Sequence, residues 1–101
     1  MRVKVNVTQH HIDNAVHRSS DRCVVALALS GVLSKGYVAG CGTYQFNIKN
    51  ADSLAIAETI ELPAEASVVI RAFDNNYVVI PCEFQIEIPD QYLDSNLLLS
   101  C

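Results

Sequence analysis

The sequence predicts a small single α+β domain in which a mainly antiparallel sheet is covered by about three helices. Segments that alternate between apolar and polar residues, as half-buried strands do, lie near both ends of the chain, at residues 2–7 and 83–88. Residues 22–34 are apolar nearly all round, which is typical of a buried helix. Turn residues separate shorter alternating runs between residues 37 and 62, so the predicted order is β-α-α-β-β-α-β.

The first strand and helix follow directly from the residue pattern. Residues 2–7 place three valines on one face, which should be the inward face of a strand. Thr8 is a favourable N-cap residue, and the apolar residues that follow it at helical spacing predict a short helix over residues 9–16.

Residues 22–34 are predicted to form the central and most buried helix. Ser20 or Asp21 can cap its N-terminus, since both side chains can accept a hydrogen bond from the first turn. Gly36 is expected to mark its C-terminal end.

The middle of the chain is predicted to form strands. Gly40–Gly42 separates two short runs and fits a tight hairpin or a strongly bent strand. Residues 54–62 alternate, but Glu58 interrupts the apolar face and predicts a bulge. The inward face of the preceding run is formed by Tyr44, Phe46 and Ile48.

A third helix and a last strand complete the predicted domain. Pro63 fits the first helical position, and Asn75-Asn76 can end the helix in a left-handed conformation. A short apolar segment, Tyr77–Ile80, stops at Pro81. In the strand that follows, Glu83, Gln85 and Glu87 should face outward, and Phe84, Ile86 and Ile88 inward.

Residues 1–89 are predicted to form the domain, and residues 90–101 a C-terminal tail without clear periodicity. Leu97–Leu99 suggests either a docked terminal turn or an exposed apolar segment. Pairing of two chains through an exposed strand edge or this tail would enlarge a modest core, so we expect a homodimer.

Charge is distributed unevenly along a chain whose net charge is −4. Residues 1–50 carry six Lys and Arg against two Asp, whereas residues 51–101 carry one Arg against nine Asp and Glu. The two halves either present separate basic and acidic surfaces or interleave and partly neutralise each other. A pI near 5.1 without a basic run argues against direct binding of duplex nucleic acid.

Cysteine usage and hydropathy predict a protein of the reducing cytoplasm. Cys23, Cys41, Cys82 and Cys101 show no CxxC spacing, and most lie among apolar residues, as reduced buried thiols do. The longest apolar run, Cys23–Leu29, is far shorter than the ~20 residues of a membrane span. No pattern of an export signal opens the chain.

Three clusters of reactive residues are candidate chemical sites. His10, His11, His17 and Cys23 match no standard zinc spacing, so no metal is expected. His17 with Cys23 could form a nucleophile pair, but no oxyanion element accompanies it. We therefore expect no catalytic residue, no cofactor and no enzymatic activity. Glu58, Glu61 and Glu65 could supply paired carboxylates for acid–base chemistry. Surface strands and helices commonly carry such acids, so we expect these three to be solvated.

The polar segment at residues 17–22 is the candidate ligand site. Hydroxyl groups, two guanidinium groups and free helix N–H groups could hold an anion or a phosphate, and Tyr37 or Tyr44 could stack on a base. The alternative is a capping segment whose arginines are only solvated. The candidate ligand residues are His17, Arg18, Ser19, Ser20 and Arg22.

Several segments resemble small uncharacterised proteins encoded by phages and prophages. Their pattern reads V-T-x-x-H-I, then C-P-V-A-L-A, and it continues with an L-P helix start, an I-R-A-F-D-like helix end and a P-x-x-F-x-I strand. The resemblance covers about residues 3–88, with Val24 in place of the expected proline and extra residues after Pro89. It implies a phage protein that acts in the bacterial cytoplasm, and it implies no activity or cofactor. The matching segments are residues 7–13, 22–29, 62–63, 70–74 and 81–86.

Two functions follow as hypotheses. The first is a non-enzymatic phage accessory protein that binds a host protein, such as a nucleic-acid-handling defence complex, and inhibits it in the manner of an anti-CRISPR protein. Its acidic residues would imitate phosphates on a basic partner surface. The alternative is a nucleotide-binding or small-molecule-binding sponge that uses residues 17–22. The predicted partner-binding residues are Glu83, Glu87, Asp90 and Asp94.

Overall fold

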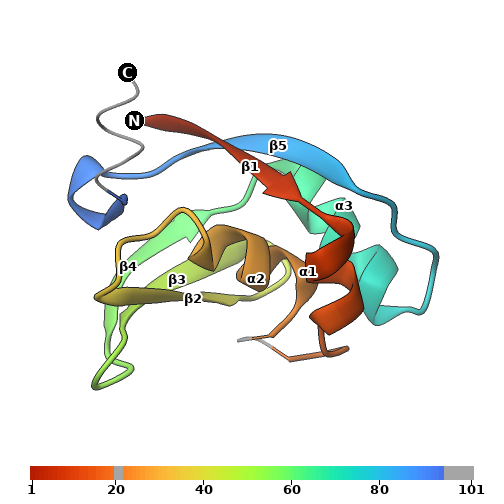
Figure 1. Ribbon diagram of the computed structural model, residues 1–101, viewed down its shortest axis with the longest axis horizontal. Helices are drawn as coiled ribbons and strands as arrows, with labels where there is room; N and C mark the ends of the chain where they lie inside the picture. Colours follow the sequence, from red (N-terminus) through yellow and green to blue (C-terminus); the bar gives the residue numbers. More distant parts are fainter. Residues whose placement is uncertain (20–21, 95–101) are drawn as a thin grey trace.

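The computed structural model describes residues 1–19 and 22–94, and it confirms the predicted α+β class (Figure 1). One more strand is present than predicted, because the segment around Gly40–Gly42 is a hairpin of two strands and not one bent strand. The Gly42 N–H donates to the Gln45 carbonyl at 2.8 Å and closes this turn. The elements are β1 (Arg2–Val7), α1 (Gln9–Asn14), α2 (Val24–Ser30), β2 (Tyr37–Cys41), β3 (Gln45–Asn50), β4 (Ile56–Glu61), α3 (Ala64–Asp74), β5 (Cys82–Glu87) and the 3-10 helix η1 (Asp90–Tyr92).

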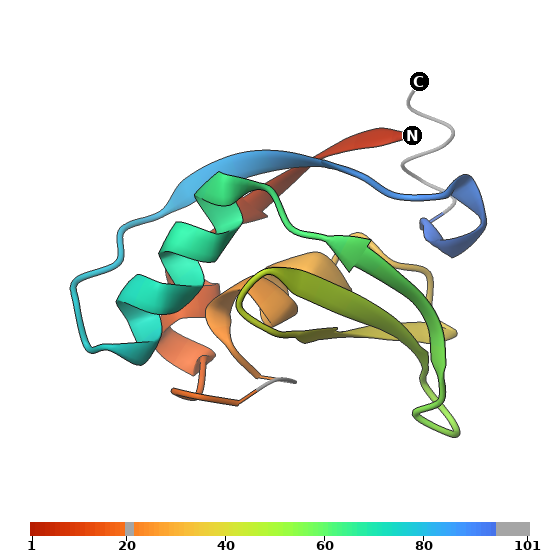
Figure 2. The ribbon, with the colours of Figure 1, turned by 180° about the vertical axis from the view of Figure 1, so that it is seen from behind.

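The strands form two antiparallel sheets and not the single sheet that we predicted. β1 pairs with β5 from Arg2 opposite Glu87 to Val7 opposite Cys82, so the two ends of the domain lie side by side. β2, β3 and β4 form a second sheet in that order. α2 lies between the two sheets and contacts both β1 and β2, as Figures 1 and 2 show.

The core forms where these layers meet. The three valines of β1 are buried, as the alternation predicts, and so are Phe84, Ile86 and Ile88. Leu29 of α2, with Phe46 and Ile48 of β3, is completely buried. The prediction that the central helix is the most buried is confirmed, since five of the seven residues of α2 are buried.

Both N-terminal helices are shorter than predicted. α1 ends at Asn14 because Ala15 is extended, although its predicted N-cap, Thr8, is confirmed by a capping box with His11. α2 spans only residues 24–30: its N-cap is Cys23, and it ends at Gly31 and not near Gly36. The predicted caps Ser20 and Asp21 lie outside the described residues.

Two further local features agree with the sequence prediction, and two differ from it. The expected irregularity near Glu58 is confirmed, since the register of β3 with β4 shifts there. Tyr44 is exposed and was wrongly assigned to the inward face, because it lies in the hairpin turn. Pro63 is the N-cap of α3 and not its first helical residue. Asn76 adopts the predicted left-handed conformation, with φ of 63°.

The first residues of the predicted C-terminal tail pack on the domain. Tyr92 and Leu93 are buried, and Leu93 forms an isolated bridge with Leu33. The Tyr92 ring meets the Tyr37 ring edge-on at 5.0 Å, and its hydroxyl donates to Glu58 at 3.3 Å. Leu97–Leu99 lies outside the described residues, and the homodimer stays a prediction. None of the described helices has the length and apolar character to cross a membrane.

Candidate functional site

The described part of the 17–22 segment is held against the C-terminal end of α3. The His17 ring stacks on Phe73 with centroids 4.2 Å apart and planes 8° apart. His17 Nδ1 lies 2.7 Å from the Phe73 carbonyl oxygen; a carbonyl can only accept, so Nδ1 carries the proton. The Arg18 N–H donates to the Asp74 carboxylate at 2.9 Å, with Arg18 in the left-handed region at φ of 59°. The Arg22 N–H donates to the Ser19 hydroxyl at 3.1 Å.

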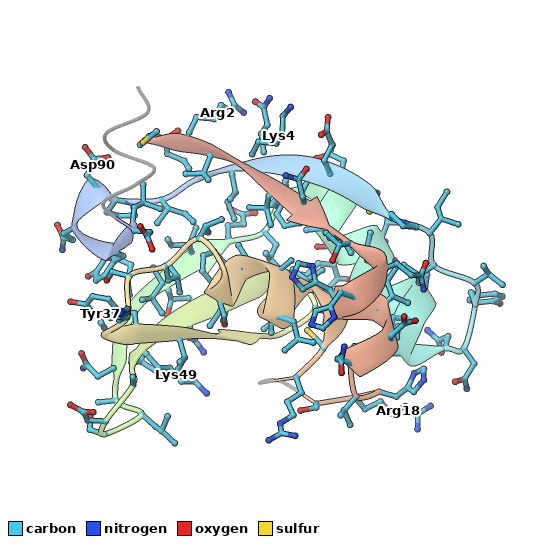
Figure 3. The ribbon with its side chains drawn as sticks, viewed as in Figure 1. Arg2, Lys4, Arg18, Tyr37, Lys49 and Asp90 are labelled. Atoms are coloured by element: carbon cyan, nitrogen blue, oxygen red, sulfur yellow. The ribbon has the colours of Figure 1, made fainter. Side chains whose placement is uncertain are left out.

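This arrangement does not favour an anion site. The hollow beside Arg18 and Ser19 has a volume of about 220 Å³, and the Asp74 carboxylate lines it. A carboxylate repels phosphate, and the Ser19 hydroxyl already accepts a backbone hydrogen bond. Figure 3 shows Tyr37 and Arg18 at opposite ends of the molecule, and the Tyr44 side chain lines a different hollow with Arg71. Ser20 lies outside the described residues.

Two thiols line the inner wall of the same hollow. Cys23 and Cys41 are buried, and their side chains are hydrogen-bonded to each other. The Cys41 thiol and the first amides of α2 donate to Cys23 and lower its pKa, while the same pairing and burial raise the pKa of Cys41. Cys23 also caps α2, its sulfur accepting from the Ala26 N–H at 3.3 Å. Cys23 therefore has a structural role as the N-cap of α2, and the His17 ring is stacked on Phe73.

The histidines of α1 also have local roles. The Thr8 N–H donates to His11 Nδ1 at 3.1 Å, and the Asn14 side chain donates to the His10 carbonyl. The rings of His10 and His11 are 6.4 Å apart. Among residues 1–19 and 22–94, no three His, Cys, Asp or Glu side chains form a group that could hold a metal ion.

Three of the four predicted partner-binding acids lie close to positive groups. Glu83 and Glu87 face outward from β5, as predicted. Glu83 forms an ion pair of 3.6 Å with Lys4, and the N-terminal ammonium lies 3.1 Å from both Glu87 and Asp90. Arg2, Lys4 and Asp90 follow one side of the molecule in Figure 3. On this side, positive groups from the first half of the chain therefore lie beside acidic residues from the second half.

The fourth predicted acid, Asp94, belongs to the segment that follows η1. Its N–H donates to the Val32 carbonyl at 3.1 Å, so its backbone is held beside the loop that follows α2. Asp94 therefore extends from a different segment than the outward face of β5.

A groove lies between α3 and β5 on the described surface, and its walls beside Val68 and Val69 are apolar. We call it the α3–β5 groove: three adjoining hollows that together run from Glu87 to Val78. The first, about 420 Å³, lies between Gln85–Glu87 and Leu62–Ala64. The second, also about 420 Å³, and the third, about 220 Å³, share the same wall residues, Val68, Val69 and Cys82. In Figure 2, α3 lies beside β5 along this line.

Large apolar side chains are exposed at one end of the groove. The exposed fraction is 91% for Val78, 70% for Ile80 and 54% for Val68. Contiguous exposed apolar surface of this kind marks interaction sites in soluble proteins. The apolar run Tyr77–Ile80 is visible in the sequence, but only the fold shows that no strand pairs with it among the described residues. The acidic residues on the groove walls are Glu61, Glu65, Glu83 and Glu87.

Comparison with protein-family models, with curated proteins and with solved structures finds no match to this chain.

Proposed function

We propose that the protein is a non-enzymatic interaction protein that binds a partner protein through the α3–β5 groove. The observation that carries the proposal is the exposed cluster of Val68, Val78 and Ile80 beside a groove with acidic walls. Burial of these side chains against a partner would release the water that now covers them, at about 25 cal/mol per Å² of apolar surface. The acids would then select among partners by charge.

The resemblance to phage proteins supports a partner in the bacterial cytoplasm. There the protein would bind a host factor, such as a nucleic-acid-handling defence complex, and block it. Glu83, with Glu61 and Glu65, would contribute charge from the groove walls, and Glu87 from its far end. The class of function is the one hypothesised from the sequence. The main binding surface, however, is now the apolar groove and not the four acidic residues.

Site-specific crosslinking tests the proposal. Benzoylphenylalanine replaces Val78, and in a matched control it replaces Asp52, which is exposed in the turn between β3 and β4. A bacterial protein crosslinked only from position 78 is then purified and titrated with the unlabelled chain. We expect Val78→Asp to weaken binding by about 30-fold, as loss of a central apolar contact does.

The fold should not change in this variant, because the side chain of Val78 is almost fully exposed. An affinity that stays the same in both Val78→Asp and Ile80→Asp would refute the groove as the binding surface.

A further inference from the structure

We infer that the partner contributes an extended segment, which adds as a third strand to the free edge of β5 in the α3–β5 groove. The inference rests on the proposed function and specifies the chemistry of the partner. The core of that segment has five residues in the order basic, apolar, polar, apolar, basic.

The hydrogen bonds at the end of the sheet show which backbone groups of β5 are free. The Met1 amine donates to the Ile88 carbonyl at 2.9 Å, and the Ile88 N–H donates to the Met1 carbonyl at 3.0 Å. Such reciprocal pairs alternate along an antiparallel ladder, so the N–H and C=O groups of Glu83, Gln85 and Glu87 point away from β1. Over residues 1–19 and 22–94, no backbone hydrogen bond uses these groups.

The segment that precedes β5 also has backbone groups without partners among the described residues. In the described chain, the backbone of Val78–Ile80 likewise makes no hydrogen bond, although Tyr77 is tied to Ala72. A two-stranded sheet is marginal by itself, and an added strand satisfies the free groups of an edge. The outer edge of β1 is less suitable, since the His11 ring is hydrogen-bonded to the Asn6 backbone there.

Charge specifies the ends of the added segment. Residues opposite Glu83 and Glu87 on a neighbouring strand are four apart and share the solvent-facing side. Two cations at these positions would face two carboxylates. The existing pair of Glu83 with Lys4 is long, and both side chains are more than half exposed, so it is weak and leaves the carboxylate available.

The apolar positions follow from the alternation of the strand. The second and fourth residues of the core would point to the same side as Phe84 and Ile86, which is the side covered by α3. Val68 and Val69 line the groove at that side, and Val68 is more than half exposed. Apolar side chains therefore fit at these two positions.

A second copy of the chain fits this edge poorly. An antiparallel pair of two β5 strands centred on Gln85 would place Glu83 of each copy opposite Glu87 of the other. Like charges directly opposite each other destabilise a sheet. The edge is thus better suited to a basic partner strand than to itself.

The test uses a fluorescein-labelled synthetic peptide with the core Lys-Val-Thr-Val-Lys, and a control peptide with the core Glu-Val-Thr-Val-Glu. We expect the basic peptide to bind at least about tenfold more tightly, since two opposite-charge pairs replace two like-charge pairs. Amide exchange measured by NMR should slow at Glu83, Gln85 and Glu87 when the basic peptide binds. Exchange at Phe84 and Ile86, which are already paired, should change little.

Two variants separate strand addition from simple apolar docking. Gln85→Pro removes an N–H that points away from β1 and so leaves the ladder with β1 intact, while Gln85→Ala keeps the N–H. We expect about a tenfold loss of peptide affinity in Gln85→Pro only. Equal affinity in both variants, failure of the basic peptide to bind, or a concentration-dependent dimer that Gln85→Pro dissociates would overturn the inference.

The purified crosslinked partner separates this inference from the proposed function. If Val78→Asp weakens the partner but Gln85→Pro does not, the groove binds a protein without strand addition. If neither variant weakens the partner, the proposed function fails as well.

Discussion

The 17–22 segment and the Tyr77–Glu87 segment differ in how many of their side chains and backbone groups have partners in the fold. The first is rich in groups that bind anions, but α3 holds His17 and Arg18 through Phe73 and Asp74. The second has few reactive groups, yet it leaves apolar side chains exposed and backbone groups without partners within the described chain. The free-energy gain available to a ligand therefore depends on which groups the fold leaves without partners, not on which residue types are present.

The largest expected difference between the two segments is in stability. Phe73→Ala should lower the free energy of unfolding by about 3–5 kcal/mol, because it removes a buried ring and the stacking partner of His17. Val78→Ala should change it by no more than about 0.5 kcal/mol, since Val78 is exposed. Urea unfolding of both variants measures the contrast. A small loss in Phe73→Ala would mean that α3 does not anchor the 17–22 segment.

Charge reversal separates the two segments in binding. Glu83→Lys with Glu87→Lys should weaken the crosslinked partner by about tenfold, slow association and reduce its salt dependence. Arg18→Glu with Arg22→Glu should leave partner affinity within about twofold, because neither residue lines the α3–β5 groove.

Native mass spectrometry of the protein purified from bacteria provides the opposing test. A retained nucleotide that Arg18→Glu with Arg22→Glu removes would support the sponge hypothesis and reverse the comparison.

A smaller effect on stability is expected from Asp74, which holds the 17–22 segment by accepting the Arg18 N–H. Asp74→Ala removes the acceptor of the Arg18 N–H and should cost about 1 kcal/mol of stability. Asp52→Ala, in the exposed turn between β3 and β4, is the control and should be neutral. Thermal unfolding of both proteins gives the two values. Equal melting temperatures would show that Asp74 does not hold the segment.

The smallest expected effect is a pH dependence from His11, whose ring is hydrogen-bonded to the edge of β1. Burial, followed by the neighbouring charge of His10, lowers the pKa of His11 from its ordinary value of 6.5. Because the unfolded chain then binds the proton more readily, this contribution is present above pH 6.5 and is lost as pH falls through the lower folded value.

Protonation also removes the Nδ1 acceptor of the Thr8 N–H. Urea midpoints between pH 7.5 and 5 should therefore fall slightly. His11→Gln, which keeps a capping-box side chain, should remove that part of the slope. A slope that His11→Gln leaves unchanged would assign the pH dependence to another group.

Local patterns predicted the elements of this fold well. The alternation of residues 2–7 and 83–88 gave the right inward faces, because a strand with one buried face must place its apolar residues at every second position. The helix ends were less predictable. Cys23 caps α2 through its sulfur and Gly31 ends the helix, although apolar residues follow at Val32 and Leu33.

Periodicity within single segments was enough to predict the class of fold, the buried central helix and the outward position of Glu83 and Glu87. Three contacts could be seen only in the folded chain: β1 pairs with β5, the Arg18 N–H meets the Asp74 carboxylate, and α3 and β5 line one hollow. These contacts join residues far apart in the chain, and a pattern within one segment does not indicate which distant residues will meet. The α3–β5 groove exists because a helix and a strand from different segments meet, leaving Val78 and Ile80 exposed beside it.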